Sequence, residues 1–96
     1  TTAKIDKLFV KFLRRRVGRT WDHVFRSIYQ FNKKLTTEQK VYVESLYDTY
    51  IELHPILRKD GAYLRADGNP IPIGLFFVDA SGILRESEKN TWILAG

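Results

Sequence analysis

The side chains in this sequence that are best suited to chemistry are cations close to its N-terminus. Residues 1–34 contain ten of the chain's 16 Lys and Arg against two Asp, a local net charge of +8. A guanidinium group donates paired hydrogen bonds that match a phosphate, and several cations on one surface release the counterions condensed on a polyanion. Phosphate binding is therefore the chemistry that these residues favour, and the candidates are Lys4, Lys7, Lys11, Arg14, Arg15, Arg16, Arg19, Arg26, Lys33 and Lys34.

The other reactive side chains lack the spacing that catalysis or metal binding requires. The absence of cysteine excludes thiolate metal sites and thiol nucleophiles. His23 and His54 form no metal-binding pair, and Asp60, Asp67 and Asp79 lie in turn sequences, where carboxylates usually shape the backbone. No serine lies in a nucleophile motif, and no glycine-rich phosphate loop is present. We therefore predict a protein that is not an enzyme and has no cofactor or metal; a metal-dependent nuclease with these aspartates converging on Mg²⁺ is the lesser alternative.

The elements that must position the cations begin with a helix over about Thr2–Val17. Apolar residues at i, i+3, i+4, i+7 and i+8 define one face: Ile5, Leu8, Phe9, Phe12 and Leu13. At about 100° per residue, the opposite face collects cations: Lys4, Lys7, Lys11, Arg14 and Arg15. Arg16 falls on the apolar side, which predicts that the helix ends near it and that Gly18 adopts a left-handed conformation.

Two further helices are predicted from capping signals. Thr20 is a suitable N-cap for a helix over 21–31, whose inner face would hold Trp21, Val24, Phe25 and Ile28. Thr36 and Gln39 have the spacing of a capping box, which predicts a third helix ending near Leu53, before His54-Pro55. The inner face of this helix would consist of Val43, Leu46, Tyr47, Tyr50 and Ile51.

Turn sequences become dense after Pro55 and indicate short strands. We predict strands over 71–78 and 82–86, joined as a hairpin by Asp79–Gly82, with further strands over 62–66 and 91–94. The expected fold class is α+β: three N-terminal helices followed by a small antiparallel β-hairpin or sheet packed on them. We expect one domain, 1–96, with a helical part of about 2–54 and a β part of about 56–95.

Aromatic residues of the β part are the candidates for contact with a partner. Adjacent side chains on a strand point to opposite faces, so one of Phe76 and Phe77 is either covered by another element or exposed to a partner. Packing is the favoured interpretation. Tyr63 is a further candidate, and Tyr42, Tyr63, Phe76 and Phe77 are the residues that could stack on unpaired bases.

Two other interpretations use the helices differently. The junction at Gly18 resembles the turn of a helix-turn-helix, in which the second helix would direct Arg19, His23, Arg26 and Gln30 outward; an ordinary helical hairpin is the favoured interpretation. A basic amphipathic helix can also lie on an anionic bilayer, but the first helix needs its apolar face for the other two. No run of about 18 apolar residues exists, so no membrane-spanning helix is predicted.

Together these patterns predict a small basic nucleic-acid-binding protein that contacts the phosphate backbone. Its expected place is an accessory subunit of a nucleoprotein complex, with an intracellular location, cytoplasmic or nucleoid-associated. The alternative is a protein-interaction or adaptor module that docks an acidic partner surface, with Phe76, Phe77 and Tyr63 as contacts. The choice between DNA and RNA, the sequence specificity and the oligomeric state stay open.

Overall fold

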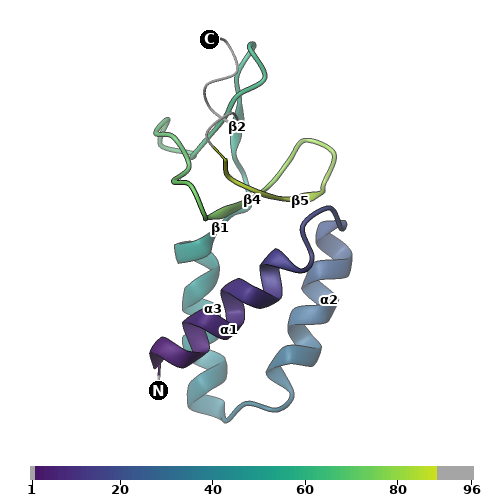
Figure 1. The fold of residues 1–96 in the computed structure, drawn as a ribbon, viewed down its shortest axis with the longest axis vertical. Helices are drawn as coiled ribbons and strands as arrows, with labels where there is room; N and C mark the ends of the chain where they lie inside the picture. Colours follow the sequence, from purple (N-terminus) through teal and green to yellow (C-terminus); the bar gives the residue numbers. More distant parts are fainter. Residues whose placement is uncertain (1, 89–96) are drawn as a thin grey trace.

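A computed structural model describes residues 2–88, and it confirms the α+β class (Figure 1). The three helices are α1 (Thr2–Arg14), α2 (Trp21–Asn32) and α3 (Thr37–Tyr50). Within the described range the strands are β1 (Ile51–Glu52), β2 (Ile56–Leu57), β3 (Tyr63–Leu64), β4 (Phe76–Val78) and β5 (Leu84–Glu86). The helices occupy one end of the molecule and the strands the other (Figure 1).

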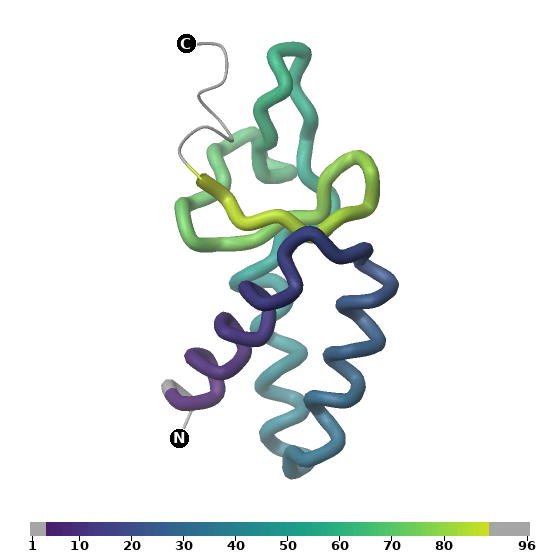
Figure 2. The backbone as a smooth tube through the Cα atoms, turned by 45° about the vertical axis from the view of Figure 1, so that its right-hand side comes forward, coloured from purple at the N-terminus to yellow at the C-terminus, as the bar shows by residue number. Residues whose placement is uncertain are grey.

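Helix α1 crosses α3 at an angle and its C-terminal end approaches α2 (Figures 1 and 2). Its apolar side chains contact both helices. Phe9 is fully buried, with its ring centroid 6.2 Å from that of Phe31 on α2 and 6.0 Å from that of Tyr47 on α3. Ile5 and Leu13 are buried on the same face, whereas Leu8, predicted to lie with them, is exposed. Because the core uses this face, a bilayer has no continuous apolar surface of α1 to bind.

The starts of α2 and α3 are fixed by caps, as predicted. The hydroxyl of Thr20 accepts a hydrogen bond from the backbone nitrogen of His23 (3.2 Å), which satisfies a free donor of the first turn of α2. Thr36 and Gln39 form the complete capping box of α3. Helix α1 ends at Arg14, slightly before the predicted end, and Gly18 has the expected positive φ of 94°.

The predicted end of α3 near Leu53 is wrong, because the helix stops at Tyr50. Ile51 already has an extended backbone, and Ile51–Glu52 form β1, which pairs in parallel with Phe76–Phe77 of β4. A short segment that pairs with a distant strand replaces the last helical turn. The sheet is therefore mixed rather than purely antiparallel, with the strand order β1-β4-β5.

The predicted hairpin is present, although its strands are shorter than expected. The β4 and β5 strands pair antiparallel, and the Asp79–Gly82 turn closes through a hydrogen bond from Gly82 N to Asp79 O (2.9 Å). The strand predicted over 71–78 begins only at Phe76, because Leu75 N bonds Pro72 O and Gly74 has a φ of 92°. The other hairpin pairs β3, predicted within 62–66, with β2, which was not predicted. The strand predicted over 91–94 lies outside the described residues.

The connection between α1 and α2 is bonded to the free side of β5. Gly18 N donates to Leu84 O (2.8 Å), Leu84 N to Arg19 O (2.9 Å), and Trp21 N to Gly82 O (2.8 Å). This segment, 18–21, covers backbone groups of the hairpin that would otherwise face solvent. It also ties the helices to the sheet, so the cations of the first helix sit on a fixed framework.

Candidate functional site

The basic face of α1, defined as Lys4, Lys7, Lys11, Arg14 and Arg15, is exposed along the whole helix. At about 100° per residue these five side chains occupy an arc of about 100°, opposite the buried face of Ile5, Phe9 and Leu13. An open groove of about 560 Å³ runs beside them, lined by Lys4, Asp6, Lys7, Leu8, Val10, Lys11, Arg14 and Tyr50. The arrangement can hold several anionic groups along one line.

Asp6 is the acidic side chain of this groove, and α3 engages it. Its carboxylate accepts hydrogen bonds from the hydroxyl of Tyr50 (2.8 Å) and from that of Tyr42. The hydrogen bond to Asp6, together with burial, raises the pKa of Tyr50. Asp6 therefore fastens α1 to α3 instead of pairing with a neighbouring lysine.

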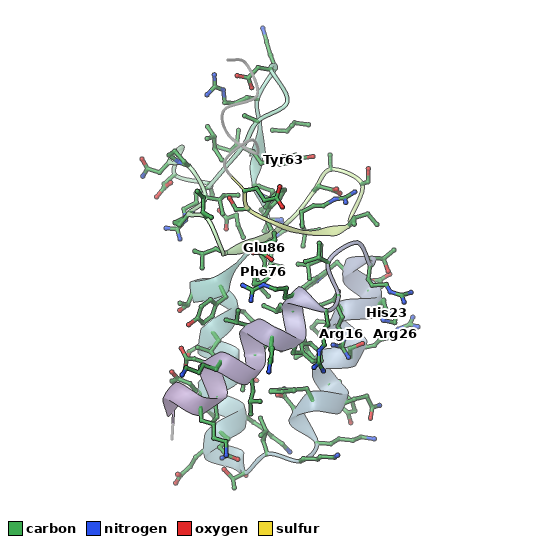
Figure 3. All side chains as sticks on the ribbon, in the orientation of Figure 1. Arg16, His23, Arg26, Tyr63, Phe76 and Glu86 are labelled. Atoms are coloured by element: carbon green, nitrogen blue, oxygen red, sulfur yellow. The ribbon has the colours of Figure 1, made fainter. Side chains whose placement is uncertain are left out.

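Arg14 connects the basic face to the sheet. Its Nε lies 3.1 Å from Oε1 of Glu86 on β5, and Figure 3 shows Glu86 above the end of α1. Within residues 2–88, Arg14 is the one member of the ten N-terminal cations that pairs with a carboxylate. Exposed ion pairs contribute about 1 kcal/mol or less, so this one holds Arg14 only weakly.

Arg16 and Arg19 do not extend this face in the same way. The Arg16 guanidinium lies 3.7 Å from the centre of the Phe12 ring, and its Nη1 donates to Phe12 O (3.1 Å). Burial and the nearby charges of Arg15 and Arg19 lower the pKa of Arg16. Figure 3 shows Arg16 directed between α1 and α2, where it is partly buried, and its predicted contact with phosphate stays a prediction. Arg19 is exposed in the junction.

The three remaining cations lie on other surfaces. Arg26 is exposed and points away from α1 on the outer side of α2 (Figure 3). Lys33 and Lys34 are exposed in the connection between α2 and α3, at the end of the helices farthest from the sheet (Figure 1). Eight of the ten cations therefore form two groups, five on the basic face of α1 and three along α2 and its C-terminal end, and Arg16 and Arg19 belong to neither.

The structure reveals exposed aromatic residues that the sequence interpretation placed in the core or left out. We call Phe25 and Tyr29 the aromatic stripe of α2; Trp21, one turn before Phe25, is partly buried and packs against the core. Phe25, predicted to face inward, is 56% exposed, and Tyr29 is 65% exposed. The Trp21 and Phe25 rings are 6.3 Å apart, and Nζ of Lys33 lies 5.7 Å from the Tyr29 ring. The i, i+4 spacing of Phe25 and Tyr29 was the signal in the sequence that could have identified this stripe.

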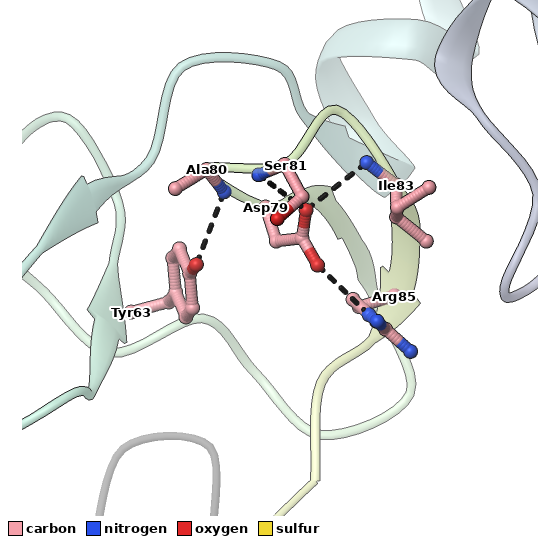
Figure 4. Close-up of polar contacts among 6 residues, drawn as sticks. All are labelled: Tyr63, Asp79, Ala80, Ser81, Ile83 and Arg85. Carbon is pink, nitrogen blue, oxygen red and sulfur yellow. Dashed lines mark hydrogen bonds and ion pairs between the residues drawn. The ribbon is translucent and has the colours of Figure 1, made fainter.

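Of the aromatic residues proposed as partner contacts in the β part, Phe76 and Phe77 are buried and Tyr63 is partly buried against them. The Tyr63 ring packs 4.8 Å from that of Phe77. The hydroxyl of Tyr63 accepts a hydrogen bond from Ala80 N (3.0 Å; Figure 4). Packing, the favoured interpretation, is what the structure shows, and these three side chains stabilise the β part.

The aspartates of the β part each serve a separate turn. Asp79 accepts hydrogen bonds from Ser81 N (2.8 Å) and Ile83 N (3.0 Å), and its other oxygen pairs with Arg85 (Figure 4). Burial disfavours the Asp79 carboxylate, but the hydrogen bonds from Arg85, Ile83 and Ser81 prevail and lower its pKa. Asp60 and Asp67 accept from Ala62 N and Asn69 N. No group of three or more His, Asp or Glu able to hold a metal occurs among residues 2–88.

The comparisons with known proteins leave function to be argued from this geometry. No protein-family model, curated protein or solved structure matches the chain. Among the described helices, none combines the length and the apolar character that crossing a membrane requires.

Proposed function

We propose that this protein is a small non-enzymatic nucleic-acid-binding protein that contacts the phosphate backbone through the basic face of α1. One observation carries the proposal: five exposed cations share one side of a helix whose other side is fixed in the core. Cations held on one rigid surface can contact successive phosphates without each contact ordering a separate segment of chain. Phosphate contacts position a nucleic acid but do not read its sequence, so binding is expected to be non-specific.

Charge distribution supports the same proposal. The residues beyond 34 carry six Lys and Arg against nine Asp and Glu, so the positive charge is concentrated on the helical part. A protein polarised in this way presents its helices to a polyanion and its β part to solvent or to another subunit. We therefore propose an accessory, intracellular role in a nucleoprotein complex.

The first experiment measures fluorescence anisotropy of labelled DNA and RNA, single- and double-stranded, with the full chain at about 50 and 200 mM salt. Five phosphate contacts predict a fall in affinity of about 500-fold over this range, from a slope of about −0.9 per contact. The preferred probe distinguishes DNA from RNA. Absence of binding at the lower salt concentration would contradict the proposal.

Two variants matched in charge localise the site. Lys7→Gln, Lys11→Gln and Arg14→Gln remove two lysines and one ion-paired arginine from the basic face. The control variant removes two lysines and one ion-paired arginine from other surfaces: Lys40→Gln, Lys59→Gln and Arg58→Gln. Arg58 matches Arg14 because it pairs with Asp60 and its side chain is 50% exposed, against 55% for that of Arg14. We expect the first variant to lower the salt slope by about 2.7 and the second to leave it nearly unchanged. Equal losses would show attraction by overall charge and not by this face.

A second candidate function, a protein-interaction module, is favoured by β2. Both of its side chains, Ile56 and Leu57, are exposed, although they are apolar. This candidate predicts a protein partner that stays bound at high salt and is lost in the Ile56→Ser, Leu57→Ser variant. A protein partner that stays bound to the Ile56→Ser, Leu57→Ser variant would contradict it.

A further inference from the structure

The aromatic stripe of α2 is a surface that the core does not require. The buried face of α2 consists of Val24 and Ile28, with Phe31 partly buried against α1. Phe25 and Tyr29 lie on the shoulder beside this face and keep more than half of their surface in water. Large aromatic side chains stabilise a protein or a complex most when they are buried. Two exposed aromatic side chains on one helix therefore indicate a surface that a partner covers.

The spacing of the stripe suits flat ligands that follow one another. Phe25 and Tyr29 are one helical turn apart, which places them about 6 Å from each other along the axis. Their exposed sides face the same direction, because residues at i and i+4 share a helix face. Each ring can therefore receive one planar group, and the two groups can belong to the same chain.

The positive charges around the stripe indicate that the planar groups belong to an anionic ligand. Arg26 is exposed on the neighbouring line of α2, and Lys33 and Lys34 follow at its C-terminal end. Nζ of Lys33 already lies over the Tyr29 ring at 5.7 Å, so a cation and an aromatic face are available at one point. Asp22, the acidic residue of α2, lies one turn before Phe25 and Arg26 on the same side of the helix and away from these lysines, so phosphates are expected at the C-terminal end of the stripe. A ligand with aromatic groups on an anionic backbone complements this surface.

We infer that the aromatic stripe binds single-stranded nucleic acid, with unpaired bases stacked on Phe25 and Tyr29 and phosphates near Arg26, Lys33 and Lys34. The inference rests on the proposed function and names its substrate class. Every base has a π face, so such stacking tolerates any sequence. In a duplex the base faces are covered by neighbouring bases, and an aromatic side chain on a helix surface cannot reach them. The stripe therefore gives a preference for single strands that the basic face of α1 alone does not give.

The test measures the affinity of the full chain for three labelled probes of about 20 nucleotides, at about 50 mM salt. They are a single strand of deoxythymidine, a single strand of abasic nucleotides, and a duplex. The abasic strand keeps the phosphates and lacks the bases. Phe25→Ala with Tyr29→Ala should weaken binding to the thymidine strand by about 30-fold and leave the other two probes unchanged.

Control variants separate stacking from folding and from general apolar surface. Val41→Ala with Ile73→Ala removes two other apolar side chains, each 63% exposed, and should leave all three affinities unchanged. Phe25→Tyr with Tyr29→Phe keeps both rings and should retain binding to the thymidine strand. Circular dichroism and thermal unfolding of every variant check that the helices persist.

The outcomes distinguish this inference from the proposed function. If the alanine pair has no effect, or weakens all three probes equally, while the basic-face variant still weakens them all, the inference fails and the proposed function stands. If the unaltered chain binds neither these probes nor the DNA and RNA probes of the anisotropy experiment, the proposed function fails and the inference fails with it. If the chain forms a dimer in sedimentation that the alanine pair abolishes, without change in binding to the thymidine strand, the stripe joins two copies and the inference is overturned.

Discussion

The helical part, residues 2–50, and the β part, residues 51–88, are held together differently. Helices from three segments meet around Phe9, with Val24, Ile28, Val43 and Leu46 fully or almost fully buried. In the β part each strand has two or three residues, and the turns depend on polar side chains. Ser87, for example, is fully buried and donates to Ile71 O (2.7 Å). Apolar periodicity therefore organises the helical part, whereas the β part adds Ile51, Phe76 and Leu84 to the same core and relies in addition on hydrogen bonds in its turns.

The largest expected effect tests the apolar side of this comparison. Phe9→Ala should reduce the free energy of unfolding by about 3–5 kcal/mol, since it leaves a cavity where α1, α2 and α3 meet. Urea unfolding followed by far-ultraviolet circular dichroism measures the change. Val41→Ala, at an exposed site on α3, serves as the control and should change the free energy by less than about 0.5 kcal/mol. A loss for Phe9→Ala as small as the control's would refute the central role of Phe9.

Asp79→Ala tests the polar side of the comparison. It removes the acceptor of Ser81 N and Ile83 N and the partner of Arg85, so a loss of about 1–3 kcal/mol is expected. Nuclear magnetic resonance should show faster amide exchange at Ser81 and Ile83, with exchange in α3 little changed. Equal acceleration throughout the chain would mean that the two parts unfold as one unit.

Thr36→Ala measures how much one polar contact contributes to the free energy of unfolding within the helical part. The substitution removes the N-cap of α3 and half of its capping box, at an expected cost of about 1 kcal/mol. Thermal unfolding measures it, and Thr36→Ser, which keeps the hydroxyl, is the matched control. A cost equal to that of Phe9→Ala would remove the contrast between the two parts.

The smallest expected effect concerns acid. The pKa of Asp79 and that of Asp67 lie below the ordinary value of 3.8 in the folded chain. Their contribution to stability is therefore complete above about pH 4 and is lost as the pH falls through the lowered values. We expect amide protection in the 79–83 turn to decline below pH 4 before that of the helices. Protection that stays constant down to about pH 2 would contradict this expectation.

Local signals explain which parts of the fold could be predicted. The caps at Thr20 and Thr36 and the Asp79–Gly82 turn depend on residues within four positions of each other, and all three are present. The end of α3 depended on a partner 25 positions away, since Ile51 pairs with Phe76. No local pattern around Ile51 contains that information.

The candidate site was predictable in part for the same reason. Helical periodicity predicted the exposed basic face of α1, and it also predicted that the helix ends near Arg16; α1 in fact ends at Arg14. It could not show that Val24 and Ile28 suffice to fill the core beside α2, which leaves Phe25 and Tyr29 outside. The space that α1 and α3 leave beside α2 decides which of its apolar side chains fit into the core. That space exists only once the helices have assembled.

The hydrogen bonds between segment 18–21 and segment 82–84 have a consequence for the order in which the protein is made. Synthesis runs from the N-terminus, so α1 and α2 leave the ribosome well before β5 exists. Until then the backbone groups of Gly18, Arg19 and Trp21 lack the partners that they have in the finished chain. A nascent chain that stops short of Gly82 can form helices, but it cannot lock the angle between the first two. Completion of β5 is therefore the step that fixes α1 relative to α2.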